Sequence, residues 1–266
     1  MNAQPALFVP HGSPMFALNP GAAGTALRAL AGQLTRPRVI VVVSPHWETL
    51  MPTVGAATTL PTIYDFSGFD RRLYELSYPA TGCPAAALEV ADALRAARLP
   101  VALDATRGLD HGAWVPLRHM FPDADIPVVP LSIQYQEGPI FAHAVGRALF
   151  PLLQRGFLIV GSGNITHNLS DWHTAMQRGG IDADYAQRFS DWVENRLEAQ
   201  AIDDLLDYRR AQFDGVRAHP RDEHLLPLFT ALGAGGPGAK ATAFHRGLSE
   251  FVLAMDGYVF QPRERL

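Results

Sequence analysis

The sequence contains only one cysteine, Cys83, among its 266 residues. An internal disulfide is therefore impossible, and zinc sites built from several cysteines are excluded. Cys83 stands in the segment Thr-Gly-Cys-Pro, just before an expected helix. We interpret it as a small residue near the helix start rather than as a catalytic thiolate.

Long apolar runs, strong net charge and targeting signals are also missing. No apolar run is long enough to span a bilayer, and the N-terminus has neither the basic region nor the apolar core of a signal peptide. A net charge of −4 with scattered Lys and Arg gives no reason to expect nucleic acid or an acidic membrane as partner. We expect a cytoplasmic globular protein, and the sequence predicts no oligomeric state.

Short β-branched runs alternate with helix-like segments along the chain. The expected strands cover residues 6–9, 38–43, 127–131 and 157–160, with a further strand around 251–255 or 258–260. The expected helices cover residues 24–34, 84–97, 140–153 and 185–199. Near-continuous apolar strands separated by helices predict an α/β fold with a largely parallel sheet. We find no repeat and no boundary, so we expect one domain over residues 1–266.

The segment from Leu50 to Ala80 differs from the rest. It is interrupted by prolines and carries five aromatic residues, which are Tyr64, Phe66, Phe69, Tyr74 and Tyr78. A loop so rich in aromatic side chains either forms a wall of a binding site or packs its rings on the body of the protein. The sequence alone leaves both possibilities open.

Histidines follow three of the expected strands. His11 follows the first strand, His46 follows the second, and His167 follows the strand at 157–160. Ligand sites of open α/β sheets form beyond the carboxyl ends of the strands, so we expect at least two of these histidines in one site. Imidazole is the commonest metal ligand and also serves as acid or base near neutral pH.

Two more histidines stand near expected helix starts. His111 precedes a helix beginning near residue 113, which Asp110 is expected to cap, and its side chain can reach a pocket. His224 is expected in the first turn of a helix, where neighbouring Glu223 would point about 100° away, so the two cannot easily face one ion. The remaining histidines that we considered, His119, His143, His173 and His245, are interpreted as structural.

Five ordered motifs resemble one known family. They are His-Gly-Ser-Pro at 11–14, Ser-Pro-His-Trp-Glu at 44–48, Leu-Asp-His-Gly-Ala-Trp at 109–114, Gly-Ser-Gly-Asn-Ile-Thr-His at 161–167 and His-Pro-Arg-Asp-Glu-His at 219–224. Together they resemble the DODA-type extradiol aromatic ring-opening dioxygenases of the LigB-like class III superfamily, which include bacterial 4,5-DOPA extradiol dioxygenases. The resemblance extends from His11 to the C-terminus.

The resemblance implies a three-layer α/β/α fold with one metal ion at the strand ends. It implies His11, His46 and His224 as metal ligands, His167 as an acid/base or an additional ligand, and His111 as a residue lining the substrate site. There we expect His111 to hydrogen-bond charge developing on the substrate. The implied reaction uses Fe(II) and O₂ to open a catechol ring, such as that of DOPA, beside its hydroxyls. Some members of the family carry zinc.

One departure leaves the metal open. Many non-haem iron oxygenases use two histidines and one carboxylate, whereas the matching position here is His224, with Glu223 beside it. Three histidines with an open position are also a catalytic zinc arrangement. Two alternatives follow, a zinc hydrolase that activates water and a non-catalytic metal-binding protein like the MEMO-like relatives of the family.

Overall fold

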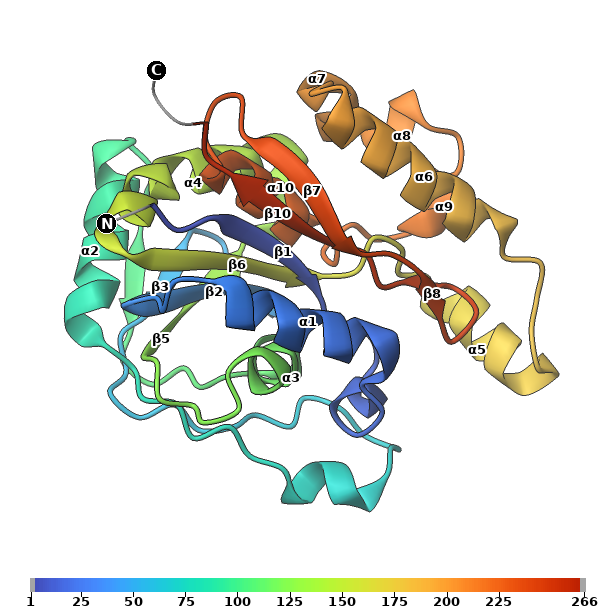
Figure 1. Cartoon of the computed structure of the whole chain (residues 1–266), viewed down its shortest axis with the longest axis horizontal. Coiled ribbons are helices and arrows are strands. Elements are labelled where there is room, and N and C mark those ends of the chain that lie inside the picture. Colours follow the sequence, from blue (N-terminus) through green and yellow to red (C-terminus); the bar gives the residue numbers. More distant parts are fainter. Residues whose placement is uncertain (1–2, 264–266) are drawn as a thin grey trace.

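The computed structural model describes residues 3–263 and is built around one large sheet (Figure 1). Within the described residues, eight strands lie in the order β4-β3-β5-β2-β6-β1-β10-β7. Their bounds are β1 Ala6–Pro10, β2 Val39–Glu48, β3 Thr53–Gly55, β4 Ala102–Asp104, β5 Val128–Ile133, β6 Phe157–Gly163, β7 Lys240–His245 and β10 Gly257–Gln261. The core strands β5, β2, β6 and β1 run parallel, as predicted, while β10, β7 and the β3–β5 pair are antiparallel.

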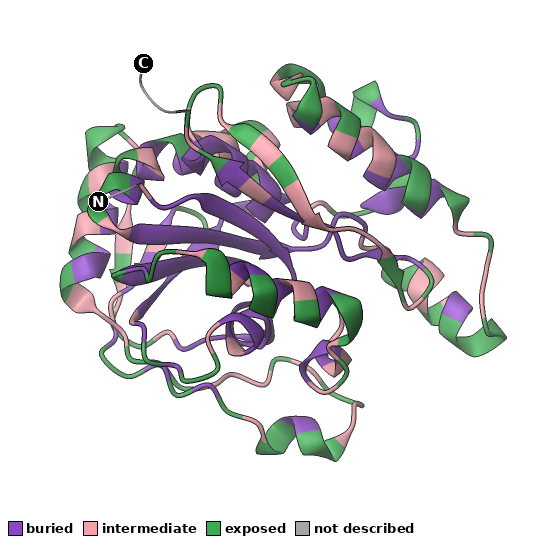
Figure 2. Ribbon diagram, viewed as in Figure 1, coloured by how far each residue is buried: buried purple, intermediate pink, exposed green. Residues whose placement is uncertain are grey.

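The central strands are buried on both faces because their side chains alternate between two cores. Val39, Val41 and Val43 of β2 belong to one core, whereas Ile40 and Val42 belong to the other. Figure 2 shows these strands as a continuous buried layer. The apolar run in β2 therefore lies in a two-sided core, as expected of a parallel sheet.

Helices cover both faces of the sheet and make the fold three-layered. On one face lie α2 (Pro84–Ala96), α4 (Gly138–Leu149) and α10 (Leu226–Ala234), of which α10 packs on β6, β1 and β2. On the other face lie α1 (Gly21–Gln33) and α3 (His111–Met120), which pack on each other. The predicted α/β class with a largely parallel sheet and flanking helices is confirmed.

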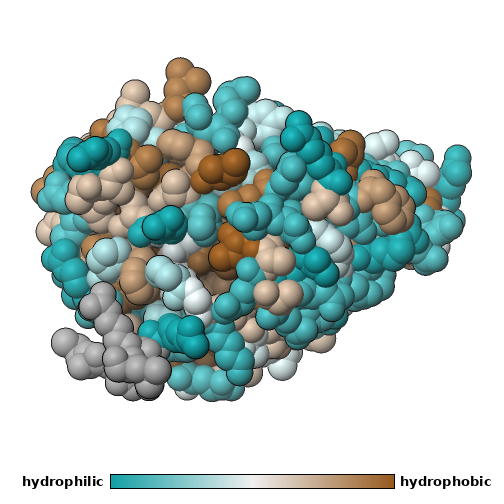
Figure 3. Space-filling model, turned by 90° about the horizontal axis from the view of Figure 1, so that it is seen from above, coloured by the Kyte–Doolittle hydropathy of each residue, from teal (hydrophilic) through white to brown (hydrophobic). Residues whose placement is uncertain are grey.

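A further group of elements lies beyond one end of the sheet (Figure 1). It comprises α5 (Leu169–Arg178), α6 (Asp184–Glu198), α7 (Ile202–Leu206), α8 (Tyr208–Ala211), α9 (Gly215–Ala218) and the hairpin of β8 (Leu248–Ser249) and β9 (Leu253–Ala254). Across residues 3–263, none of the helices combines the length and apolarity needed to span a bilayer. The face seen in Figure 3 carries its hydrophobic side chains in small patches among hydrophilic ones.

Several predicted boundaries need correction. The second strand does not end before His46 but continues to Glu48, with an irregularity in its pairing with β5 after Val43. Pro45 has no N–H to donate to the ladder, which fits that irregularity. The helix expected over 140–153 is α4 followed by a 3-10 helix at Phe150–Arg155. His224 precedes α10 and is not in its first turn.

Candidate active site

Histidines from five separate places in the chain converge beyond the carboxyl ends of the central strands. They are His11 after β1, His46 near the end of β2, His111 at the start of α3, His167 after β6 and His224 just before α10. Except for His11, which lies fully buried beneath, these residues line one cavity. The structure therefore brings together every site residue that the sequence predicts.

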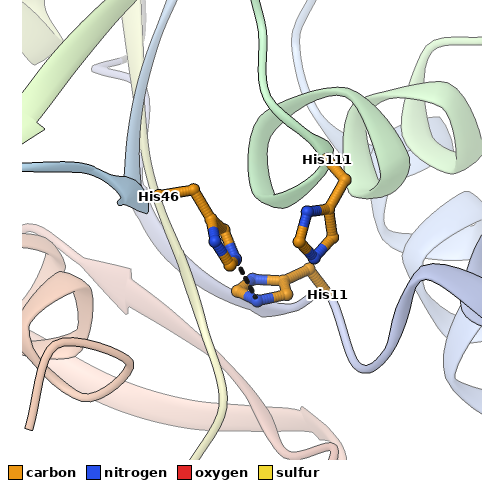
Figure 4. A group of neighbouring side chains, drawn as sticks. All are labelled: His11, His46 and His111. Carbon is orange, nitrogen blue, oxygen red and sulfur yellow. Dashed lines mark hydrogen bonds between the residues drawn. The ribbon is translucent and has the colours of Figure 1, made fainter. Parts of the chain in front are cut away.

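The rings of His11, His46 and His224 form a nearly regular triangle. Their ring centroids are 5.3, 5.2 and 5.0 Å apart for the pairs 11/46, 11/224 and 46/224. His111 lies on the other side of His46, with ring centroids 4.1 Å apart. Figure 4 shows His11, His46 and His111 facing one another, with a close approach of 3.4 Å between Nε2 of His46 and Nε2 of His11.

The backbone of β6 holds two of these histidines in place. His11 donates its backbone N–H to the carbonyl of Gly163 at 3.2 Å, and the backbone N–H of Asn164 donates to the carbonyl of His224 at 3.1 Å. A Cβ atom at Gly163 would collide with this His224 carbonyl. The Gly-Ser-Gly-Asn motif thus permits a close approach of three segments.

The tautomer of His11 follows from its partner. The hydroxyl of Ser162 donates its proton to the carbonyl of Gly112, so the same oxygen must accept from Nδ1–H of His11 at 3.0 Å. Nε2 of His11 is then unprotonated and presents its lone pair toward His46. This is the form in which imidazole binds a metal, with the other ring nitrogen fixed by a hydrogen bond.

Glu223 plays the corresponding part for His224. Its Oε1 lies 2.8 Å from Nδ1 of His224 and 3.8 Å from Nδ1 of His167. The expectation that Glu223 points away from His224 on a helix is wrong, because this segment is a turn in which the carboxylate contacts the ring. His167 stacks on His224 with ring centroids 3.4 Å apart.

Asp65 is a site residue that the sequence interpretation missed. Its Oδ1 lies 3.0 Å from Nδ1 of His111, and its Oδ2 lies 3.4 Å from Nδ1 of His46. It lies between Tyr64 and Phe66, in the aromatic-rich segment from Leu50 to Ala80, which is called the aromatic segment below. Its place directly between two aromatic residues is the signal that the sequence offers, and that signal does not identify His111 and His46 as its partners.

Burial keeps the imidazoles of His11, His46, His167 and His224 neutral. Desolvation, aided by neighbouring histidines, lowers the pKa of His46 and of His167 to about 3 and holds the pKa of His11 and of His224 well below the ordinary value. Burial alone would raise the pKa of Asp65, but the hydrogen bonds and charge of His111, together with His46, bring it down to about 2. The site therefore combines neutral nitrogen donors with an ionised carboxylate behind them.

Asp110 and Arg107 connect the start of α3 to the end of β2. As predicted, it caps this helix by accepting from the backbone N–H of Ala113 at 3.1 Å, and it also accepts from the hydroxyl of Ser44 at 2.5 Å. Arg107 donates to the other oxygen of Asp110 and to the carbonyl of His46, at 2.6 and 3.2 Å. The end of β2 is thereby tied to the start of α3.

These residues fit a divalent metal ion. Two nitrogens bound tetrahedrally to one ion at about 2.1 Å would lie about 3.4 Å apart, which equals the separation of the Nε2 atoms of His11 and His46. Within the described chain, two groups offer ligand atoms within 4.8 Å of one another: one is His11, His46 and His111, and the other is His167, Glu223 and His224. The ring triangle of His11, His46 and His224 spans both groups.

A cavity of about 400 Å³ opens above the histidines. Its apolar wall comes from the aromatic segment, from α5 and from β9, through Phe66, Phe69, Leu169, Trp172 and Leu253. The aromatic segment thus forms part of the binding wall with Phe66 and Phe69. Of its other rings, Tyr78 packs on the body with 1% exposure, whereas Tyr74 is 40% exposed. The size and apolar lining suit a small aromatic ligand.

Within the described chain, none of the histidines that we interpreted as structural lines this cavity. His119, for example, lies on α3, with Nε2 3.0 Å from the carbonyl of Phe16. His219, a part of the last motif, is fully buried and lies 2.8 Å from the carbonyl of Ile165. It contributes to packing beneath His167 and not to the cavity lining.

Comparison with known proteins assigns the family. Residues 6–254 match the family described as the catalytic LigB subunit of aromatic ring-opening dioxygenase. The chain is 36% identical to a protein of Beta vulgaris named 4,5-DOPA dioxygenase extradiol, over 97% of both chains. It is 40% identical to a protein of the same name from Escherichia coli K12, over 86% of this chain and 84% of that protein.

A solved structure supports the same assignment. The crystal structure of an uncharacterized protein from Escherichia coli K12 matches with a TM-score of 0.78 and 33% identity, over 97% of this chain and 99% of that one. The chain therefore belongs to the LigB family of aromatic ring-opening dioxygenases. It is an extradiol ring-cleaving dioxygenase, an enzyme that acts on an aromatic substrate with O₂. The hydrolase and non-catalytic alternatives are not favoured.

Proposed function

We propose that this enzyme opens the ring of DOPA or a closely related catechol, with one Fe(II) ion held by His11, His46 and His224. The observation that carries the proposal is the triangle of their rings at the floor of an aromatic-walled cavity. The substrate class rests on the names of the beet and Escherichia coli relatives. We take residues 1–266 as one extradiol dioxygenase domain, which the family match over 6–254 supports.

Fe(II) is the proposed ion because it supplies an electron path between the catechol and O₂, whereas zinc has no accessible redox couple. Three neutral histidines also bind zinc, so a zinc-loaded protein is expected after purification under some conditions. Such a protein would bind a catechol without opening it.

His167 is the proposed acid/base. Its ring is neutral because burial lowers its pKa to about 3, so one ring nitrogen presents a free lone pair. Its Nδ1 faces Glu223, at 3.8 Å, which leaves Nε2 for a catechol hydroxyl. The ring would hold that proton and return it to the opened product.

His111 is proposed to act on the other side of the cavity. With Nδ1–H directed at Asp65, its Nε2 accepts a proton from the substrate, and the resulting cation is stabilised by the carboxylate behind it. The imidazolium then donates a hydrogen bond to charge developing on the substrate oxygen. Phe66, whose ring centroid lies 5.6 Å from that of His111, would wall the aromatic ring.

The test is reconstitution of the metal-free protein with Fe(II) under argon, followed by DOPA and simple catechols in air. We expect O₂ uptake at an electrode together with a yellow ring-opened product. The zinc-loaded protein is the matched control, and it should consume no O₂. Failure of the iron-loaded protein to consume O₂ with every catechol would overturn the proposal, and turnover of an ester or amide by the zinc form would favour the hydrolase alternative.

A further inference from the structure

Asp65 stands behind two imidazoles that come from different elements. Its Oδ1 accepts from the backbone N–H of His111 at 2.9 Å and lies 3.0 Å from Nδ1 of the same residue. Its Oδ2 lies 3.4 Å from Nδ1 of His46. One carboxylate thus contacts the end of β2 and the start of α3 at once.

We propose that Asp65 is a positioning residue that sets the tautomer of His111 and His46, keeping Nδ1 of each ring protonated and Nε2 free to face the centre of the site. An ionised carboxylate has no proton to donate, so a neutral ring beside it must present its N–H there. The Nε2 atoms are then left as acceptors, as the proposed roles of both histidines require. To this extent the inference rests on the proposed function.

The rings of His11 and His224 have oxygen partners of their own at Nδ1. Nδ1 of His11 is held by Ser162, and Nδ1 of His224 lies 2.8 Å from Glu223. In all four rings Nδ1 thus faces an oxygen atom, and these oxygens belong to three residues, Asp65, Ser162 and Glu223. A change at Asp65 should affect His46 and His111 only, which makes His11 and His224 internal controls.

Asp65 also joins the aromatic wall to the histidines. It precedes Phe66, which lines the cavity and lies edge-to-face against His111 with a 5.6 Å separation of centroids. Nearby, the indole N–H of Trp114 on α3 donates to the carbonyl of Ile63 at 3.2 Å. These contacts hold the aromatic segment against α3. Within that segment, Asp65 is the residue that contacts His46 and His111.

The decisive variant is Asp65→Asn. The amide has nearly the same shape, and its oxygen can still accept from the backbone N–H of His111. Its NH₂ group must donate, however, so a ring beside that group has to accept at Nδ1 and carry its proton on Nε2. With that oxygen kept beside the backbone N–H and Nδ1 of His111, the NH₂ group takes the place of Oδ2 beside His46. The tautomer of His46 should therefore invert, while a purely structural role for Asp65 would leave it unchanged.

The tautomers can be read directly by ¹⁵N NMR of histidine-labelled protein. We would compare the zinc-loaded wild type, Asp65→Asn and Asp70→Asn at pH 8, above the ordinary imidazole pKa of about 6.5. Asp70 is a matched control because it lies in the same segment and contacts Arg72, away from the histidines. We expect zinc ligation through Nε2 of His46 in the wild type and in Asp70→Asn, and loss of that ligation in Asp65→Asn, with Nδ1–H on His111 in all three proteins.

Kinetics provide the second readout. In the iron-loaded enzyme, Asp65→Asn should lower kcat by about 10- to 100-fold, the usual effect of losing an outer-shell partner, with a smaller change in KM. Unchanged histidine signals together with wild-type kcat would overturn the inference. If Asp65→Asn does not fold, Asp65→Ala replaces it; an unmixed Nδ1–H signal of His111 in that variant would also overturn it. Inactivity of the wild type would count against the proposed function alone, since the NMR result decides the role of Asp65.

Discussion

His167 and His224 lie face to face, with ring planes only 12° apart and centroids separated by 3.4 Å, and Glu223 contacts both rings. The two histidines are therefore neighbours with different proposed tasks. His224 belongs to the triangle with His11 and His46, whereas His167 lies beside it at the cavity. Removal of His224 should therefore affect metal binding, whereas removal of His167 should affect proton transfer.

His167→Gln should retain the metal and lose turnover. Glutamine preserves much of the shape of the ring but cannot accept the proton, and general acid/base groups contribute about 10²- to 10⁴-fold to rate. We expect wild-type iron content by elemental analysis and a kcat lower by about that factor in O₂ uptake. Loss of the iron in this variant would instead make His167 a ligand.

His224→Ala should lose the metal. The variant removes one of the three proposed ligands and leaves the cavity lining otherwise intact. We expect iron and zinc contents far below one per chain and no O₂ uptake with any catechol. His111→Ala is the matched comparison, because His111 belongs with His11 and His46 to a group able to hold an ion. If His111→Ala loses the metal and His224→Ala retains it, the proposed ligand set is wrong.

Gly112→Ala should displace the ring of His46 without replacing any proposed ligand. A Cβ atom there would collide with Oγ of Ser44 and lie 2.7 Å from Cδ2 of His46, so the ring must move. Overpacking of this kind costs about 1–3 kcal/mol. We expect a lower free energy of unfolding in urea and weaker metal binding in a competition assay with a chelator.

Gly32→Ala provides the control for this substitution. Gly32 lies in α1, and a Cβ atom there meets nothing within 4 Å. Alanine should raise the free energy of unfolding by up to about 1 kcal/mol through helix propensity and leave metal affinity unchanged. Equal metal affinity in both variants would show that Gly112 does not control the position of His46.

The central strands could be predicted from the sequence because each of them consists of a recognisable apolar run. The β-branched run in β2 and the apolar run in β6 are buried on both faces. A near-continuous apolar run of this length predicts a buried strand without knowledge of its neighbours. The strands β3, β4 and β7 lie at or near the edges, and β4 and β7 are only partly buried. Their sequences lack an apolar run, and they form strands because a neighbour offers its hydrogen-bonding edge.

Of the residues that form the site, only the histidines could be predicted from the sequence. Their order along the chain and their places near strand and helix ends indicated a common centre. Asp65 could not be assigned in this way, because its partner His111 lies 46 residues further along the chain and meets it only when the aromatic segment docks on α3. Nor does the sequence reveal that Ser162 fixes His11, since that hydroxyl gains its role from a contact with Gly112.

The buried imidazoles should make the protein acid-sensitive, and His219 offers a test outside the proposed ligand set. Burial lowers the pKa of His219 to about 3, below the value of about 6.5 expected in the unfolded chain. The unfolded state therefore binds more protons, and stability is complete above pH 6.5 and falls as the pH drops toward 3. His219→Gln can keep a hydrogen bond to the carbonyl of Ile165 without a titrating ring. We expect urea unfolding between pH 6.5 and 4.5 to show a slope shallower by up to about 1.4 kcal/mol per pH unit in this variant, and an identical slope in both proteins would contradict the assignment of a neutral buried imidazole.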